Sequence, residues 1–435
     1  MSGIAGLYYF DGRQVGPGLM EHMVDSMAGH RGPDAQAVWS DGQIGLAHCM
    51  LYTTPESLSE HLPAANCAGN IVITADARID NREELLAALG RSVLGQDCAD
   101  SQLLLAGYER WGEAVVSHLV GDFAFVVWDA RARRLFCAVD QLGAGQLYYT
   151  HRPNRFFACG SEIKALAATD EVVLEIDEVR LGESLAWMRR PPDSTVFKGV
   201  SKLPPAHAMS IEPAGIKLWR YWTIEPSEEA TQLNREACTE RFLELFTEAV
   251  RCRIRSAYPV GIELSGGLDS SFVTGVARSI VEREGGPDLK TYSNVYDDVA
   301  GSDERYYIRQ MLALGGLEPH FIRSDQYGPL STARDMYDYL DDGRMGVGGT
   351  YRRWQLFKTA KQTGARVLLT GIDGDTTVSH GREYFAELAA EERWDDFARE
   401  AEQYVGRLGQ ERASYDTQEA SIDSPSLILQ KAGYP

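Results

Sequence analysis

The sequence lacks the features of a secreted protein, of a membrane-spanning protein and of a protein with a cysteine-bound metal site. Its 435 residues include only seven cysteines, and no two of them are spaced as C-x-x-C. The cysteines therefore indicate neither a zinc site nor a disulfide framework. No apolar run reaches the length of a transmembrane helix, and the first residues do not have the basic and apolar regions of a secretory signal. These absences predict a cytoplasmic protein.

Basic residues are scarce relative to acidic ones. There are 43 Lys and Arg against 63 Asp and Glu, which gives a formal net charge of −20 at pH 7. Such a chain is not expected to bind nucleic acid or an anionic membrane surface. ATP is not excluded, since local geometry and Mg²⁺ can hold it. The length predicts two domains, each large enough for its own core.

The pattern of apolar runs divides the chain into two parts. Residues 1–212 alternate short strands, hairpin-like pairs and helices, which indicates an α+β domain. Residues 213–235 are the predicted linker, and their polar stretch is 225–234. Residues 236–435 alternate strands with helices, which indicates a parallel sheet that binds ligands outside the carboxyl ends of its strands. The first part has predicted strands at 4–10, 44–49, 71–76, 123–128, 135–139, 146–151 and 155–159 and helices at 19–27, 82–89 and 101–110. The second part has predicted strands at 259–264, 290–296, 319–323 and 366–370.

The densest motif is S-G-G-L-D-S-S at 265–271, between a predicted strand and a helix. Strand, glycine-rich turn and helix direct several backbone N–H groups at one point, and anions bind there. No lysine follows the glycines, so the motif is not a Walker A loop. It resembles the pyrophosphatase-type loop of enzymes that split ATP between its α- and β-phosphates; an ordinary Ser/Gly loop is the alternative. The predicted nucleotide-binding residues are Leu264, Ser265, Gly266, Gly267, Leu268, Asp269, Ser270 and Ser271.

Asp269 is the unexpected member of this motif. A carboxylate in a phosphate-binding loop repels its ligand unless a cation lies between them, so Asp269 is predicted to bind Mg²⁺. A second loop, T-G-I-D-G-D at 370–375, follows another predicted strand at the same edge of the sheet. A polar turn is the alternative for its carboxylates. This loop supplies the remaining predicted ligands, which are Gly371 and Gly374 for the nucleotide and Asp375, with Asp269, for the metal.

Five further motifs occur in order along the first part of the chain. They are S-G-I-A-G at 2–6, G-H-R-G-P-D at 29–34, G-D-F-A-F at 121–125, L-Y-Y at 147–149 and G-S-E-I-K-A-L at 160–166. With S-G-G-L-D-S-S, they make the chain resemble the asparagine synthetase family over nearly its whole length. The resemblance implies an α+β N-terminal-nucleophile (glutaminase-like) αββα domain followed by an α/β parallel-sheet, ATP-pyrophosphatase-type synthetase domain, with ATP and Mg²⁺ as cofactors. Synthetase domains of this family continue through further helices, so we expect this one to be short at its C-terminus.

The first part departs from the family at the residues of the glutaminase reaction. Ser2 stands in place of the nucleophilic cysteine, and the arginine that clamps the glutamine carboxylate falls on Met50. The Asn-Gly pair of the oxyanion hole falls on Asp76 and Ala77, where a carboxylate opposes the charge that must develop. Only Asp100 remains near a matching position. We therefore expect a glutaminase fold without glutaminase activity.

The family has members that need no glutaminase. β-Lactam synthetases and the macrolactam-forming cyclases of lasso peptide biosynthesis adenylate a carboxylate and let an amine of the same molecule attack it. The segments 51–57 and 370–381 are most similar to the lasso cyclases. The resemblance implies an AMP-forming carbon–nitrogen ligase that joins a side-chain carboxylate of a precursor peptide to the peptide's own amine. The partners it implies are the precursor peptide and, from the same pathway, a leader-peptide-binding protein and a protease.

The base that activates the amine is not in its family position, where this chain has Ile372. Asp373 and His380 are the predicted catalytic residues instead, with a structural role as the alternative for His380. Two other functions stay open. One is an ammonia-dependent, asparagine-synthetase-like or β-lactam-synthetase-like amide ligase, and the other is a catalytically inactive nucleotide-binding partner in a peptide-maturation complex.

Overall fold

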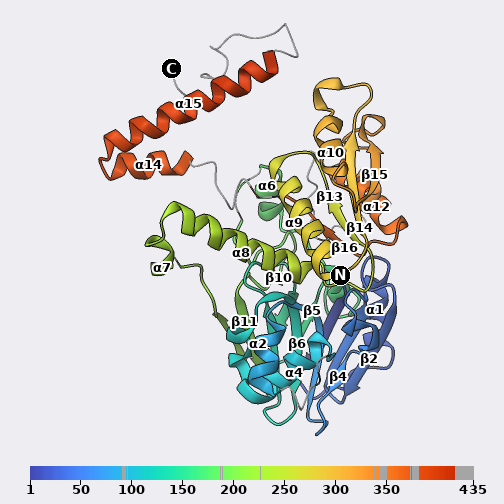
Figure 1. Ribbon diagram of the computed structural model, residues 1–435. Helices are drawn as coiled ribbons and strands as arrows, with labels where there is room; N and C mark the ends of the chain where they lie inside the picture. The colour runs from blue at the N-terminus through green and yellow to red at the C-terminus, as the bar shows by residue number, and fades with distance from the viewer. Residues whose placement is uncertain are drawn as a thin grey trace. The chain divides into compact units, whose positions relative to one another are not determined.

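The computed structural model describes residues 1–90, 95, 97–186, 188, 190–225, 227–337, 339, 341, 350–372, 374 and 382–416. These residues belong to two compact units, Met1–Thr370 and Gly371–Pro435. The described part of the first unit contains three sheets, whose strands and helices are labelled in Figure 1.

The first two sheets are antiparallel and have six strands each (blue to green in Figure 1). The first sheet has the order β10-β8-β9-β1-β3-β2, and the second has the order β12-β11-β7-β6-β5-β4. The first is built from β1 (Gly3–Tyr9), β2 (Ala35–Asp41), β3 (Ile44–Met50), β8 (Tyr148–Arg152), β9 (Phe156–Gly160) and β10 (Ser201–Lys202). The second is built from β4 (Ala64–Ala65), β5 (Ile71–Ile79), β6 (Gly121–Asp129), β7 (Arg134–Val139), β11 (His207–Glu212) and β12 (Gly215–Arg220).

These two sheets pack face to face and are covered by helices on their outer faces. Buried side chains of β1, β3 and β9 form one apolar cluster with those of β6, β7 and β11, which closes the sandwich. Helices α1 (Leu19–Ala28) and α5 (Ile163–Ala167) pack on the first sheet. Helices α2 (Arg82–Leu89) and α4 (Asp100–Trp111) pack on the second sheet. The αββα arrangement predicted for this part is confirmed.

The third sheet is parallel and has the order β15-β14-β13-β16. Apolar residues of α8 and α9 cover one face of it, and α12 covers the other. This confirms the predicted parallel α/β sheet. The elements are α8 (Arg235–Arg253), β13 (Val260–Glu263), α9 (Leu268–Glu284), β14 (Leu289–Val295), α10 (Arg305–Leu312), β15 (Glu318–Arg323), α12 (Thr350–Gln362) and β16 (Val367–Leu369).

Short elements connect these layers. They are η1 (Glu56–Ser59), η2 (Gly112–His118), α6 (Glu178–Leu185), α7 (Glu228–Thr231), η3 (Ala300–Ser302), η4 (Ser324–Gln326) and α11 (Ala333–Tyr337). Strand β12 lies inside the predicted linker and pairs along its length with β11, so the second sheet extends to Arg220. The domain boundaries drawn from the sequence stay a prediction.

The second unit, as far as it is described, is a pair of helices, α14 (Arg382–Ala390) and α15 (Trp394–Asp416). The ring of Phe385 packs edge-on against those of Phe397 and Tyr404, with centroids 5.5 and 5.8 Å apart. Edge-to-face aromatic contacts of this kind hold two helices together.

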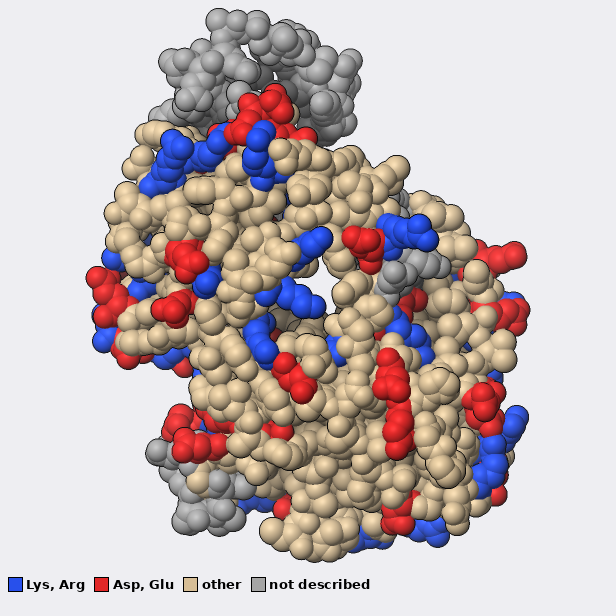
Figure 2. Space-filling model, turned by 90° about the vertical axis from the view of Figure 1, so that its right-hand side faces the viewer, with Lys and Arg blue, Asp and Glu red and all other residues tan. Residues whose placement is uncertain are grey.

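The surface in Figure 2 carries Lys and Arg interspersed with Asp and Glu, so this face has no broad patch of one sign. Such a face offers no focused field to steer a nucleic acid. Among the helices in the described ranges, none is long and apolar enough to cross a membrane.

Candidate functional site

The loop between β13 and α9 has the strand–turn–helix geometry predicted from the sequence. Gly266 has a φ of +88°, and a Cβ there would lie 3.0 Å from the Cβ of Tyr307, so the position requires glycine. The hydroxyls of Ser265 and Ser270 are 2.9 Å apart, and the Ser265 N–H donates to Ser270 Oγ at 3.2 Å. These bonds fix the turn while the first N–H groups of α9 have no helical acceptor, which is the geometry of an anion site.

Asp269 lies in the first turn of α9 and is half-buried. Its carboxylate makes no ion pair or hydrogen bond in the part of the chain that the structure describes. An unengaged carboxylate beside an anion site is a suitable ligand for Mg²⁺, which prefers oxygen and keeps several waters and phosphate oxygens around it. No group of three or more His, Cys, Asp or Glu within the described ranges could hold a metal by itself. Asp269 therefore fits a Mg²⁺ whose other ligands come largely from the nucleotide.

The other predicted ligands are in the second unit or outside the described residues. Gly371 and Gly374 form a turn in which the Gly374 N–H donates to the Gly371 carbonyl at 3.4 Å. Ile372 is 41 % exposed. Asp373, Asp375 and His380 lie outside the described residues, so their catalytic and metal-binding roles stay predictions. The nucleotide-binding role of Leu264–Ser271 also stays a prediction.

The carboxyl edge of the parallel sheet also carries charged groups, of which Glu263 was not singled out from the sequence. Glu263 ends β13, directly before the loop. Arg352, in the first turn of α12, donates from Nη1 to the Tyr296 hydroxyl at 2.7 Å. The signal for Glu263 was available, because a charged residue interrupts an otherwise apolar run that reads as a buried strand.

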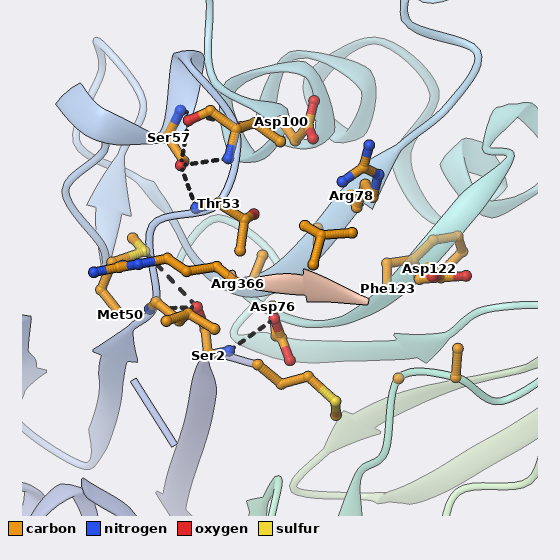
Figure 3. A pocket seen from close by; sticks show the side chains of 18 of the residues that line it. Ser2, Met50, Thr53, Ser57, Asp76, Arg78, Asp100, Asp122, Phe123 and Arg366 are labelled. Carbon is orange, nitrogen blue, oxygen red and sulfur yellow. Dashed lines mark hydrogen bonds between the residues drawn. The ribbon is translucent and has the colours of Figure 1, made fainter. Parts of the chain in front are cut away.

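A second candidate site is a cavity of about 330 Å³ in the first unit, shown in Figure 3. The cavity is lined on one side by the start of the chain, the end of β3 and residues of β5. Strand β16 lines it on another side. All the residues that were predicted to replace the glutaminase groups lie around it. The lining includes Ser2, Met50, Asp76, Ala77 and Asp100, together with Arg366, Val367, Leu368 and Leu369.

Ser2 is held by its neighbours in this cavity. Its Oγ accepts a hydrogen bond from the Leu51 N–H at 3.0 Å and lies 3.8 Å from the sulfur of Met50. Its N–H donates to Asp76 Oδ1 at 3.1 Å, and Figure 3 shows the two residues facing each other. Burial raises the pKa of Asp76, and the positive charges of the chain's terminal amine and of Arg31 partly oppose this rise. The acidic side chain thus lies beside Ser2, at the position where the sequence predicts that oxyanion donors are missing.

Asp100, the one residue near a matching family position, is engaged elsewhere. Its carboxylate pairs with Arg82, accepts from Arg255 at 3.0 Å and accepts from the Ile79 N–H at 3.1 Å. It is buried. A carboxylate that already accepts from these three donors is held in place, and it has less capacity to bind an ammonium group.

The N-terminal sandwich and the parallel sheet are joined by ion pairs close to this cavity. Arg253 at the end of α8 lies 3.0 Å from Asp80, and Arg366 donates to Asp34 at 3.1 Å. The Arg366 guanidinium also lies 4.0 Å from the ring centroid of Tyr258. The interface therefore fixes the amino-terminal end of the parallel sheet, opposite the edge that carries the 265–271 loop.

Comparison with known proteins identifies both parts of the chain. Residues 1–222 match a family model described as a glutamine amidotransferase domain, and residues 241–427 match the model for asparagine synthase. Glutamine-hydrolysing asparagine synthetase 3 of Bacillus subtilis (strain 168) is 33% identical over 335 residues, which are 74% of this chain and 53% of the relative. Amidase chry2 of Gibberella zeae is 30% identical over 380 residues, 84% of this chain and 55% of the relative. Amidase chyE of Penicillium rubens is 28% identical over 385 residues, 86% and 56% of the two chains. The chain spans about half the length of these curated relatives.

Proposed function

The chain belongs to the asparagine synthetase family of ATP-dependent amide ligases, and from this premise we propose that it forms an amide bond without hydrolysing glutamine. We propose further that it is an AMP-forming cyclase of the lasso peptide type. It joins a side-chain carboxylate of a precursor peptide to an amine of the same peptide. A leader-peptide-binding protein and a protease are the proposed pathway partners.

The observation that carries this proposal is the state of the N-terminal cavity. Met50 places a thioether where a clamp for a substrate carboxylate is needed, Asp76 faces Ser2, and Asp100 is already paired. A domain built this way supplies no ammonia, so the nitrogen of the product comes from another source. An amine on the activated molecule itself is the source that needs no second binding site.

The loop at 265–271 supports attack at the α-phosphate. It offers serine hydroxyls and helix N–H groups to hold a pyrophosphate but no lysine to stabilise a transferring γ-phosphoryl group. The substrate carboxylate oxygen attacks the α-phosphorus, and pyrophosphate leaves. Asp269, with Asp375 as its predicted companion, would hold Mg²⁺, which offsets the negative charge of the leaving group when bound. The amine then attacks the acyl-adenylate, and holding both ends of one peptide together lowers the barrier by several kcal/mol.

The test uses the full chain, Mg·ATP and synthetic peptides that each carry a free N-terminal amine and one Asp or Glu. We expect a product lighter than the peptide by one water, with AMP and pyrophosphate formed in equal amounts, by mass spectrometry and nucleotide chromatography. Asp269→Asn should reduce product formation at least about tenfold because a metal ligand is lost. Asp170→Asn, an exposed carboxylate of the N-terminal part, is the matched control and should leave the rate unchanged.

Other outcomes would contradict the proposal in different ways. ADP and phosphate as products would exclude adenylation. Amidation by added ammonium, without cyclised peptide, would favour the ammonia-dependent ligase. Binding of Mg·ATP with no turnover of any peptide would favour the inactive nucleotide-binding partner.

A further inference from the structure

Glu263 occupies an unusual position in the parallel sheet. Side chains alternate along β13, so Val260 and Ile262 enter the apolar cluster under α8 and α9 while Glu263 projects to the opposite face. Its register partner on β14 is Tyr292, which belongs to the cluster under α12. Glu263 is therefore a carboxylate on the α12 face of a central strand, at the edge where open parallel sheets bind ligands.

One of the two oxygens of this carboxylate is not satisfied within the described residues. Its Oε2 is buried and has no hydrogen-bond partner among the residues that the structure describes. Leaving a buried acceptor unpaired costs free energy, and the cost is larger when the acceptor is charged. Glu263 lies at the end of its strand, two residues from Ser265. An unpaired buried oxygen at such a place is expected of a group whose hydrogen-bond partner is a bound ligand.

The neighbouring arginines do not supply the missing hydrogen-bond donor. Arg352 directs its Nη1 at the Tyr296 hydroxyl, 2.7 Å away. Within the described ranges, neither Arg352 nor Arg353 forms an ion pair with Glu263. Burial raises the pKa of Glu263, and the charges of Arg353 and Arg352 only partly oppose this. The group is thus a better proton acceptor than an ordinary glutamate on the surface.

We propose that Glu263 binds the attacking amine of the substrate through an N–H···O hydrogen bond and accepts the proton that its nitrogen loses when the amide forms. This inference rests on the proposed function. The neutral amine forms a C–N bond at the adenylate carbonyl, the bond from that carbon to the phosphate oxygen breaks, and AMP leaves as an anion. The proton goes from nitrogen to the Glu263 carboxylate and then to water.

The chemistry of the surroundings favours an amine over other ligands. A carboxylate only accepts hydrogen bonds, so a phosphate oxygen would be repelled by it. A metal ion is disfavoured because the positive charges of Arg353 and Arg352 already act on Glu263. An amine supplies the missing donor and is the one reactant of the proposed step that must lose a proton.

The test separates the two half-reactions in the full chain, with the same synthetic peptides and Mg·ATP. Peptide-dependent exchange of labelled pyrophosphate into ATP reports adenylation, and the dehydrated peptide reports amide formation. Glu263→Gln keeps the shape but accepts no proton. We expect exchange within about twofold of the parent and cyclisation reduced about 100-fold, the usual effect of losing a general base. Retained exchange also shows that the variant is folded.

A trapping experiment and a control variant test the same assignment further. Hydroxylamine, a nucleophile that is neutral near pH 7, should trap the adenylate of Glu263→Gln as the hydroxamate at the parent rate. The control is Glu318→Gln, a glutamate of the same sheet that starts β15 at the amino edge and pairs with Lys290. It should change neither half-reaction.

Three outcomes would overturn the inference. Cyclisation by Glu263→Gln at the parent rate would show that the carboxylate has no part in amide formation. Loss of exchange together with weaker ATP binding in a folded variant would assign Glu263 to the nucleotide. Parent protein that neither exchanges nor cyclises would defeat the proposed function itself, and this inference with it.

Discussion

At the level of single residues, the side chains around the N-terminal cavity carry the proposal that the glutaminase reaction is lost. In that proposal, each group that the reaction needs is either replaced or engaged. Ser2 Oγ accepts a backbone N–H, Asp76 takes the Ser2 N–H, and Asp100 lies between Arg82 and Arg255. Restoring one residue would therefore not restore the site.

We predict that the parent protein and Ser2→Cys both release no glutamate from glutamine. The cysteine would be a better nucleophile, but the substrate would still lack its carboxylate clamp and its oxyanion donors. An enzyme-coupled glutamate assay on protein with and without its initiator methionine measures this. Turnover by Ser2→Cys alone would show that Met50 and Asp76 do not block the reaction.

A second prediction concerns Glu60, which lines the same cavity. Burial raises its pKa from 4.5 to about 7, although the Ser101 N–H at 3.2 Å stabilises the charged form. Between these pH values the folded chain binds a proton at Glu60 that the unfolded chain does not. The free energy of unfolding therefore falls as pH rises through this window, by up to about 3 kcal/mol.

Glu60→Gln should lack this fall. Denaturant unfolding of parent and variant at several pH values gives the difference, since all other titrating groups are shared. We expect the variant to gain stability relative to the parent as pH rises. Parallel curves for the two proteins would show that Glu60 titrates like a surface glutamate.

Residue-level changes were only partly readable from the sequence. The substitutions at Ser2, Met50 and Asp76 were visible because a motif fixes where each role falls. The engagement of Asp100 by Arg255 was not, because the partner lies 155 positions away and no pattern pairs them. The unpaired oxygen of Glu263 was hidden for the same reason, since it depends on what α12 places nearby.

Among helices and strands, apolar periodicity predicted many of those whose faces are buried, although the buried strand β11 was not among the predicted spans. The helix predicted at 82–89 is α2, and the strands of the parallel sheet lie within one or two residues of their predicted spans. Strand β2 was missed. It is polar, partly exposed and at the edge of its sheet, so pairing with β3 rather than its own pattern makes it a strand. The loop at 370–375 was predicted from its sequence motif alone, and its predicted site residues Asp373 and Asp375 lie outside the described residues.

The turn before α9 yields a prediction at this scale. Gly266→Ala forces a side chain onto a backbone with φ of +88° and against Tyr307 Cβ and the Glu304 carbonyl, at 3.0 and 3.3 Å. We expect a loss of about 1–3 kcal/mol of stability and of Mg·ATP binding, measured by thermal unfolding and calorimetric titration.

Gly275→Ala is the matched control because it lies inside α9, where a new Cβ meets nothing closer than Met311 Cε at 3.9 Å. Alanine there should stabilise the helix by up to about 1 kcal/mol and leave nucleotide binding intact. If both variants bind Mg·ATP like the parent, the turn is not the nucleotide site.

At the scale of the whole molecule, the N-terminal sandwich is joined to the parallel sheet through partly buried charges. Arg255 donates to Glu56 at 2.7 Å and to Asp100 at 3.0 Å, and the Ala257 N–H donates to the Thr53 carbonyl at 2.8 Å. Arg366, at the start of β16, adds its pair with Asp34. Partly buried pairs with several hydrogen bonds couple two folded parts more strongly than exposed ones.

We predict one cooperative unfolding transition for the parent and two for Arg255→Met with Arg366→Met. Removing the arginines leaves Asp100 and Asp34 short of donors and costs about 3 kcal/mol or more at the interface. Differential scanning calorimetry resolves the transitions. Arg241→Met, an exposed arginine of α8, is the control and should keep the single transition. A single transition in the double variant would mean that apolar contacts alone join the two parts.

The contacts of residues 252–258 have a consequence for how the polypeptide can be cut. By sequence this segment belongs to the synthetase part, yet Arg253, Arg255 and Ala257 attach it to the N-terminal sandwich. The exposed stretch before α8 is the natural place for a protease to nick the chain. The two fragments should then co-elute as one non-covalent particle, and the N-terminal fragment expressed alone should leave its acidic residues Asp80, Asp100 and Asp122 without part of their counter-charge. Cutting the chain before α8 would thus leave the two fragments bound to each other. In chimeras with relatives, the two parts would not behave as interchangeable modules.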